Sequence, residues 1–276
     1  MFWNHAVPEG PIGLIAGQGE FPVLFAKAAS SLNKNLVVIG IKGYTDKRVE
    51  AFAREAHYLE LGALGALIEL LKHAKLKKVV LAGSIPKREI YNPQFKPDET
   101  AKGFITNTRN KGDDHILKAF QLFLKMKCGV SIIDSRIFLK HVLAPKGVLT
   151  RRKPSPSERA DLKFGYSIAK GIGKLDIGQT VVVKDGVVLA VEAIEGTDRA
   201  ILRGGELGNG EAVVVKVSKP RQDLRFDLPC VGLETIETLA KAGIKVLGLE
   251  SGKTLMLSKD KFIERADSEN MTLVGF

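Results

Sequence analysis

The sequence has few cysteines, few aromatic side chains and no long apolar run. Its 276 residues include two cysteines, four tyrosines and one tryptophan. Cys128 and Cys230 lack the close spacing of zinc ligands, and we interpret both as buried thiols in a reducing cytosol. No apolar run reaches membrane-spanning length, and 45% hydrophobic residues are typical of a soluble globular chain. The first residues, MFWNHAVPEG, carry no basic segment or cleavage signal, so we expect no secretory leader.

Acidic residues are also scarce relative to basic ones. The chain has 31 Asp and Glu against 42 Lys and Arg, which gives a net charge of +11. Such a balance favours an anionic partner, which could be nucleic acid, a phosphorylated small molecule or an anionic membrane surface. Because no basic–aromatic RNA-binding motif is present, we predict that nucleic acid is not the partner.

The first half alternates short apolar runs with helical patterns, which is typical of a Rossmann-like parallel α/β domain. We place this domain at residues 1–150. Helices are expected around 23–30 and 64–73, and strands at 12–16, 36–41, 58–61, 78–81 and 129–133.

Two turns at strand ends are candidate ligand sites. The first, AGQGEFP, supplies Gly17, Gly19, Glu20 and Phe21, and its glycines let backbone N–H groups approach a phosphate at a helix N-terminus. It lacks the third glycine of a dinucleotide fingerprint, and Pro22 stands where the helix should begin, so a plain tight turn is an open alternative.

The second turn follows the strand at 78–81. It supplies Gly83, Ser84, Lys87 and Arg88, whose hydroxyl and cations could hold a phosphate or a uracil ring. Open parallel sheets bind ligands at this carboxyl edge.

The second half, residues 151–276, predicts a mixed α+β domain. Residues 154–157 (PSPS) read as a linker, and a capped helix is expected at 157–174. Lys184-Asp185-Gly186 is a hairpin signal between two strands. A further strand is expected in 211–218, a helix at 235–242, strands at 244–249 and 255–257, and a C-terminal helix.

A cluster of acids and arginines lies between residues 192 and 235. Clustered carboxylates suit Mg²⁺ shared with substrate phosphates, and arginines suit phosphate oxygens. Exposed ion pairs and turn caps are the alternative for each single acid. The members are Glu192, Glu195, Asp198, Arg199, Arg221, Asp223, Arg225 and Asp227.

Four motifs carry a family resemblance. They are IAGQGEFPVLFAKAA, KGDDHILKAF, EGTDRAI and KPRQDLRFDLPCVGLET. In this order, over essentially the whole chain, the sequence resembles the UDP-2,3-diacylglucosamine pyrophosphatases of the LpxI family. The resemblance implies hydrolysis of UDP-2,3-diacylglucosamine to UMP and 2,3-diacylglucosamine 1-phosphate (lipid X). This is an Mg²⁺-dependent step of lipid A biosynthesis in Gram-negative bacteria.

The resemblance also suggests roles for residues. An aspartate of the second domain is required in the family, and QDLRFD offers Asp223 and Asp227, with Arg225 between them. We expect Glu195 and Asp198 to complete a metal shell with these two aspartates. Residues expected to bind substrate are Gly17, Gly19, Glu20, Phe21, Gly83, Ser84, Lys87, Arg88, Thr197, Arg199, Gln222 and Thr235.

The expected setting is the cytoplasm, peripheral to the anionic inner-membrane surface where the lipid substrate resides. No amphipathic helix stands out in the sequence as an anchor, and a homodimer is left open.

Two other functions stay open at this point. One is an NAD(P)-dependent oxidoreductase, although no clear acidic residue ends the strand LVVIGI to hold a ribose. The other is a non-catalytic carrier of nucleotide sugars or lipids.

Overall fold

In a computed structural model, the chain is described for residues 7–85, 89, 92, 95–108, 113–220, 223–225 and 228–276, the side chains of 113–115 excepted. It forms two compact units. The N-terminal unit is Met1–Leu139 with Asp223–Asp227, and the C-terminal unit is Lys140–Gln222 with Leu228–Phe276. A short segment far along the chain therefore belongs to the N-terminal unit.

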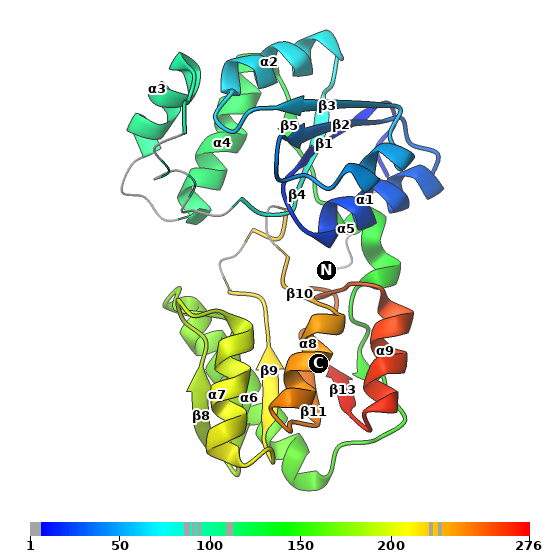
Figure 1. Cartoon of the computed structure of the whole chain (residues 1–276), viewed down its shortest axis with the longest axis vertical. Helices are drawn as coiled ribbons and strands as arrows, with labels where there is room; N and C mark the ends of the chain where they lie inside the picture. The colour runs from blue at the N-terminus through cyan, green and yellow to red at the C-terminus, as the bar shows by residue number, and fades with distance from the viewer. Residues whose placement is uncertain are drawn as a thin grey trace. The chain divides into compact units, whose positions relative to one another are not determined.

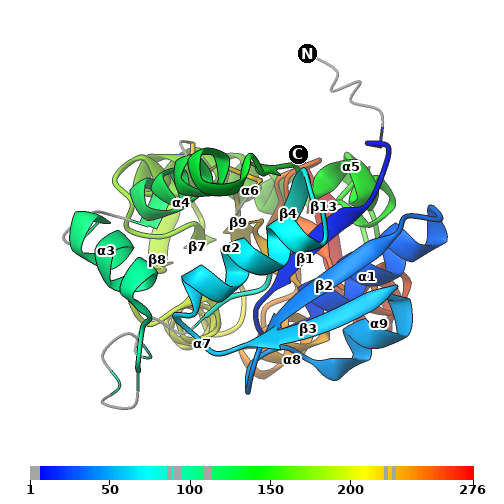
Figure 2. The ribbon, with the colours of Figure 1, turned by 90° about the horizontal axis from the view of Figure 1, so that it is seen from above.

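The N-terminal unit is built on a five-stranded parallel sheet in the order β3-β2-β1-β4-β5 (Figure 1, Figure 2). A parallel sheet covered on both faces is buried throughout, so its central strands are continuous apolar runs. The predicted Rossmann-like arrangement is confirmed. The strands are β1 (Ile12–Ala16), β2 (Leu36–Ile41), β3 (Glu55–Leu59), β4 (Lys78–Ala82) and β5 (Ser131–Ile132).

Helices cover both faces of this sheet. On one face Phe25 of α1 and Phe138 of α5 meet edge to face, with ring centroids 5.1 Å apart. On the other face Leu71 of α2 and Leu124 of α4 are fully buried in a cluster with Val79. The helices are α1 (Glu20–Ser31), η1 (Lys47–Phe52), α2 (Leu64–His73), α3 (Glu99–Thr108), α4 (Asp113–Cys128) and α5 (Arg136–Leu139).

The C-terminal unit contains a six-stranded mixed sheet in the order β6-β13-β11-β9-β7-β8. Strands β13, β11 and β9 pair in parallel, whereas β6 pairs antiparallel with β13, and β7 pairs antiparallel with both β9 and β8, which confirms the predicted mixed class. The strands are β6 (Gly147–Val148), β7 (Thr180–Lys184), β8 (Val187–Val191), β9 (Val213–Lys216), β11 (Val246–Leu249) and β13 (Thr272–Gly275). A separate pair is formed by β10 (Cys230–Val231) and β12 (Leu255–Met256).

Side-chain alternation divides the core of this unit into two layers. Val181 and Val183 of β7 pack beneath α6, whereas Val182 packs with Ile201 of α7 on the opposite face. Figure 1 shows α7 and α8 beside the strands of this sheet. The helices are η3 (Lys140–Val142), α6 (Pro156–Lys174), α7 (Thr197–Gly208), α8 (Leu233–Lys241) and α9 (Lys259–Ser268).

Helix α7 is an element that the sequence analysis does not anticipate, because its segment is rich in glycine. Gly204 and Gly205 disfavour a helix intrinsically, but both lie where a side chain has no room. A Cβ on Gly204 would be 2.5 Å from Cβ of Val182, and one on Gly205 would be 2.4 Å from the carbonyl oxygen of Ala242. Close packing against β7 and α8 therefore selects glycine here and stabilises the helix despite its composition.

Other differences are small and follow from pairing. β3 ends at Leu59, which pairs with Ile41 at the end of β2, rather than extending to residue 61. α6 begins at Pro156 because the Ser155 hydroxyl and the Glu158 carboxylate form a reciprocal capping box. β13 is an additional strand that the sequence analysis does not anticipate. Within the described residues, no helix is both long and apolar enough to span a bilayer.

Candidate functional site

The carboxyl edge of the N-terminal sheet is the first candidate surface. The chain order reverses on either side of β1, so β1 and β4 flank the topological switch point at which doubly wound sheets bind ligands. The segment after β1 carries Gly17 and Gly19, and the segment after β4 carries Gly83 and Ser84. The structure therefore brings the two predicted glycine turns to one place.

A short antiparallel bridge joins these two turns. The Gln18 amide donates to the Ser84 carbonyl at 2.9 Å, and the Ser84 amide donates back at 3.3 Å. A Cβ on Gly17 would lie 2.6 Å from the Ser84 carbonyl oxygen, so only glycine allows this approach. Gly19 differs, since it is the N-cap of α1 at φ 98° and nothing lies within 4 Å of its missing Cβ. The bridge thus explains Gly17, and the open helix N-terminus explains Gly19.

The two residues that follow Gly19 have structural partners. Glu20 accepts from the Arg48 guanidinium, which also binds Asp46. Phe21 is 9% exposed. A ligand at this turn would therefore meet the backbone of Gly19 before the Phe21 ring.

The segment 223–225 lies with the N-terminal unit. Arg225 Nε donates to Asp223 Oδ1 at 2.9 Å, and Arg225 Nη2 donates to Gln121 Oε1 of α4 at 3.1 Å. Hydrogen bonding from Arg225 lowers the pKa of Asp223, with a smaller contribution from the charge of Lys118. Asp223 is thus an ionised acceptor held beside α4.

A second Asp-x-Arg pair, which the sequence analysis misses as a site, follows β5. Asp134 accepts from the Arg136 backbone amide at 2.8 Å and from its guanidinium, as Asp223 does from Arg225. Hydrogen bonding to Asp223 raises the pKa of Arg225, and the charge of Asp134 adds a smaller contribution, so the two pairs are neighbours. Polar residues directly after a strand of a parallel sheet were the available signal.

In the C-terminal unit, three polar side chains meet at the end of β9. Lys216 Nζ donates to Thr197 Oγ1 at 3.3 Å, and Thr197 Oγ1 donates to Glu192 Oε1 at 2.8 Å. Glu192 Oε2 also accepts from the Gln179 amide at 3.3 Å. Lys216 and Glu192 are buried, at 8% and 9% exposure. Of these, only Thr197 is among the predicted substrate-binding residues.

The predicted metal-binding acids of this unit are near α7. Glu195 pairs with Arg203 at 2.8 Å, and its pKa is lowered by its own backbone amide and by Arg203. Asp198 and Arg199 are exposed in the first turn of α7. Across the part of the chain that the structure describes, no three Asp, Glu, His or Cys side chains gather as a metal site.

A further network, absent from the sequence analysis, surrounds Glu250 at the end of β11. Glu250 is 4% exposed and accepts from Ser218, Lys170 and Lys253, each within 2.8 Å. Burial alone would raise the pKa of Glu250, but the hydrogen bonds from these partners lower it to about 2. The network fixes Ser218 at the start of the segment that leads to Asp223.

The remaining predicted residues fall into two groups. Thr235 is 8% exposed, and its hydroxyl accepts from the Gly232 amide at 3.2 Å as part of the cap of α8. Five residues lie outside the described part of the chain, namely Lys87, Arg88, Arg221, Gln222 and Asp227.

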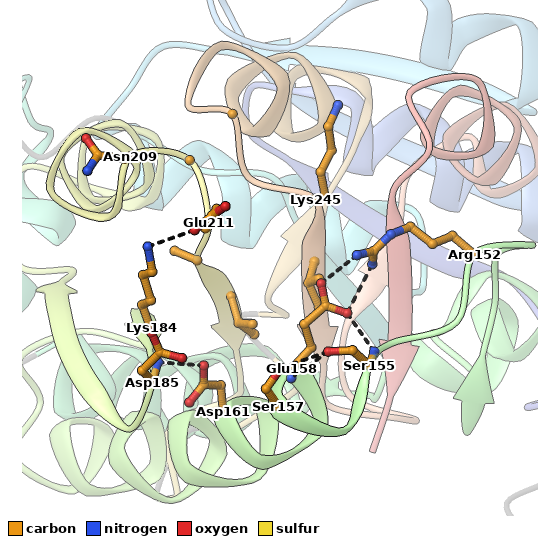
Figure 3. A pocket seen from close by; sticks show the side chains of 15 residues that line it. Arg152, Ser155, Ser157, Glu158, Asp161, Lys184, Asp185, Asn209, Glu211 and Lys245 are labelled. Atoms are coloured by element: carbon orange, nitrogen blue, oxygen red, sulfur yellow. Dashed lines mark hydrogen bonds and ion pairs between the residues drawn. The ribbon is translucent and has the colours of Figure 1, made fainter.

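A cavity of about 520 Å³ opens in the C-terminal unit at the amino edge of the sheet, beside Val213 and Val246 (Figure 3). Two ion pairs line its wall. Arg152 pairs with Glu158, and Lys184 with Glu211. It lies at the opposite ends of β9 and β11 from Lys216 and Glu250, so it is separate from the carboxyl-edge networks.

Both halves of the chain match domains of one protein family. The LpxI N-terminal domain matches residues 11–142, and the LpxI C-terminal domain matches residues 145–274. The UDP-2,3-diacylglucosamine pyrophosphatase LpxI of Caulobacter vibrioides is 31% identical over 274 residues, covering 96% of each chain.

Two solved structures show distant similarity. An ADP complex of N5-carboxyaminoimidazole ribonucleotide synthetase matches at 14% identity with a TM-score of 0.25, over 76% of this chain and 47% of that one. The biotin carboxylase domain of Hydrogenobacter thermophilus 2-oxoglutarate carboxylase matches at 13% identity with a TM-score of 0.24, over 71% and 41%.

Proposed function

We propose that this chain, which belongs to the LpxI family, hydrolyses the pyrophosphate bond of UDP-2,3-diacylglucosamine. The observation that carries this function is the match of both family domains in order, together with 31% identity to a named pyrophosphatase over 96% of both chains. The products are UMP and 2,3-diacylglucosamine 1-phosphate, and the pathway is lipid A biosynthesis.

The chemistry requires water to attack phosphorus in line with the leaving phosphate, so the protein contributes positioning and charge neutralisation. Asp223 is suited to orient a polar group because the Arg225 guanidinium holds it ionised and fixes its direction. Arg225 places positive charge beside Gln121 and Asp223, where it can face a phosphate oxygen. Asp227 is the other candidate of this segment.

Magnesium belongs to the proposal as the ion that would neutralise charge on the phosphate oxygens. Asp223, Asp198 and Glu195 offer carboxylate oxygens, which are the donors that Mg²⁺ prefers, but no three acids gather as a metal site among the described residues. Two of these carboxylates are already ion-paired, with Arg225 and Arg203. Glu195, Asp198, Asp223 and Asp227 stay the acids that we propose to bind the ion.

The function is tested by release of UMP from UDP-2,3-diacylglucosamine with the purified full chain. We expect UMP to appear in Mg²⁺ and to stop on addition of EDTA, with recovery when Mg²⁺ is restored. Binding of the substrate with no UMP under any of these conditions would favour the non-catalytic carrier. A control with boiled protein accounts for spontaneous hydrolysis.

Contact with the anionic inner-membrane surface is part of the same proposal, and helix α4 offers a surface for it. Leu122 and Met126 are 59% and 71% exposed and lie four residues apart, so they share one helix face. Lys118 precedes them on that face by another four residues, and Lys125 is adjacent. An apolar stripe beside lysines fits a bilayer surface with negative charge. A homodimer stays a prediction.

The membrane proposal predicts salt-sensitive co-sedimentation with vesicles of anionic phospholipid. We expect a Leu122→Gln/Met126→Gln double variant to bind several-fold less well, because it loses the apolar area that enters the lipid. Leu175→Gln is the matched control, since Leu175 is 72% exposed in the C-terminal unit. Equal binding by all three proteins would remove α4 as the contact, and no binding at low salt would remove the membrane contact itself.

A further inference from the structure

Lys216 is a buried cation in the C-terminal unit. It is 8% exposed at the carboxyl end of β9, and it donates to Thr197 Oγ1 at 3.3 Å and to the Cys230 carbonyl at 3.0 Å. An ammonium has three protons to donate. No carboxylate within the described residues lies close enough to form an ion pair with it. A buried charge of this kind calls for an anionic partner.

The N-terminus of α7 lies against the same ammonium. Gly196 is the N-cap at φ 86° and has no side chain to cap the helix, and Thr197 is the first helical residue. The amides of a first helical turn have no acceptor inside the helix, and together with the helix dipole they attract anions. Two carboxylates lie near this turn. Glu195 is paired with Arg203 at 2.8 Å, and the buried Glu192 accepts from the Thr197 hydroxyl at 2.8 Å and from the Gln179 amide at 3.3 Å.

A second observation points to a ligand at this place. Thr180 is fully buried, and its hydroxyl has no hydrogen-bond partner among the described residues. Thr180 pairs directly with Lys216 across the antiparallel strands β7 and β9, so the two side chains emerge on the same face of the sheet. Buried hydroxyls are nearly always hydrogen-bonded in folded proteins, so an unpartnered one beside a buried cation points to a polar ligand group as its partner.

We infer that Lys216, Thr197 and the first turn of α7 form a binding subsite for a phosphoryl group of a phosphate or diphosphate ester. Lys216 would supply the charge, and the α7 amides the directional hydrogen bonds. Under the proposed function, on which this assignment rests, the group is one phosphate of the substrate diphosphate.

The competing explanation is that Lys216 serves only to tie β9 to α7 and to the strand at Cys230. The two explanations differ in what they predict. If Lys216 is only a structural tie, its replacement would lower thermal stability and weaken the binding of all ligands alike. If it belongs to a phosphoryl subsite, its replacement would weaken the binding only of ligands that carry phosphate, whatever happens to the melting temperature.

The test compares the full chain with its Lys216→Met variant in titration calorimetry against UDP and against uridine. Methionine keeps the length and apolar stem of lysine without the charge. We expect affinity for UDP to fall about tenfold to a hundredfold, as for loss of a hydrogen bond to a charged group, with affinity for uridine unchanged. Lys245→Met is the matched control, since Lys245 is an exposed lysine at the amino edge of the same sheet.

A Thr197→Val variant extends the test if Lys216→Met does not fold, because it removes only the hydroxyl that holds the ammonium. The same selective loss of UDP would then support the subsite. The subsite is overturned if either folded variant binds UDP as tightly as the full chain. It is also overturned if the full chain binds UDP no more tightly than uridine. The UMP-release assay tests the proposed function independently. If the full chain releases UMP but Lys216→Met binds UDP as tightly as the full chain, only the subsite is refuted. If the full chain releases no UMP but loses UDP affinity on Lys216→Met, only the hydrolysis is refuted.

Discussion

The Glu250→Gln variant is expected to lose about 3 kcal/mol of the free energy of unfolding at pH 7. Glu250 has its pKa lowered to about 2 in the folded protein, from a model-peptide value of 4.5. A depressed carboxyl pKa stabilises the fold above pH 4.5, and this contribution disappears as the pH falls from 4.5 towards 2. The amide resembles the protonated acid, so the gap between the two proteins should close over the same window.

The measurement is urea unfolding followed by far-ultraviolet circular dichroism at pH 7, 4 and 3, for both proteins. Glu211→Gln is the control, because Glu211 pairs with Lys184 but its side chain is 84% exposed. Exposed pairs contribute at most about 1 kcal/mol, so this control should change little. A gap between wild type and Glu250→Gln that is constant with pH would contradict the network as described.

The Asp223→Asn variant is expected to lower kcat for UMP release by about a hundredfold to ten-thousandfold while leaving the protein folded. Asparagine keeps the shape of aspartate but removes the charge that fixes the Arg225 guanidinium at 2.9 Å. Both side chains are partly exposed, at 21% and 34%, so the effect on stability should be small. Asp227→Asn is expected to behave in the same way.

Activity and folding are measured together for these variants, with kcat and KM from initial rates and the melting temperature from circular dichroism. Glu99→Gln serves as the control, since Glu99 forms an exposed ion pair with Lys102 in the same unit. Near-normal kcat in both aspartate variants would rule out this segment as the source of the catalytic carboxylate. A fall in kcat for one of them alone identifies which aspartate the reaction needs.

Much of the secondary structure could be predicted because its cause is local. Residues 12–16 and 36–41 are apolar runs that form buried parallel strands, and residues 64–73 have a helical apolar pattern. Lys184-Asp185-Gly186 is a hairpin turn in which Asp185 and Gly186 adopt φ values of 49° and 73°. Such features depend on neighbours in the sequence, which a reader of the sequence can see.

The sequence predicts the two glycine turns after strands β1 and β4, but it does not show that Gly17 and Gly19 have different roles. Gly17 is required because the Ser84 backbone approaches it, and Ser84 lies far along the chain. Gly19 is required by a positive φ at the start of α1. Only the pairing of β1 with β4 shows which glycine closes the bridge.

The sequence by itself determined the family, the alternation of strands and helices in the first half, and the acids and arginines of QDLRFD. The tertiary structure alone decided that residues 197–208 are a helix, because Gly204 and Gly205 gain contact with Val182 and Ala242 that outweighs their poor helix propensity. It also decided that Lys216 lies close to Glu250, because Lys216 ends β9 opposite Leu249 of β11 and Glu250 is the next residue. The physical reason is that propensity acts between adjacent residues, whereas burial and charge compensation act between residues that meet only after the chain has folded.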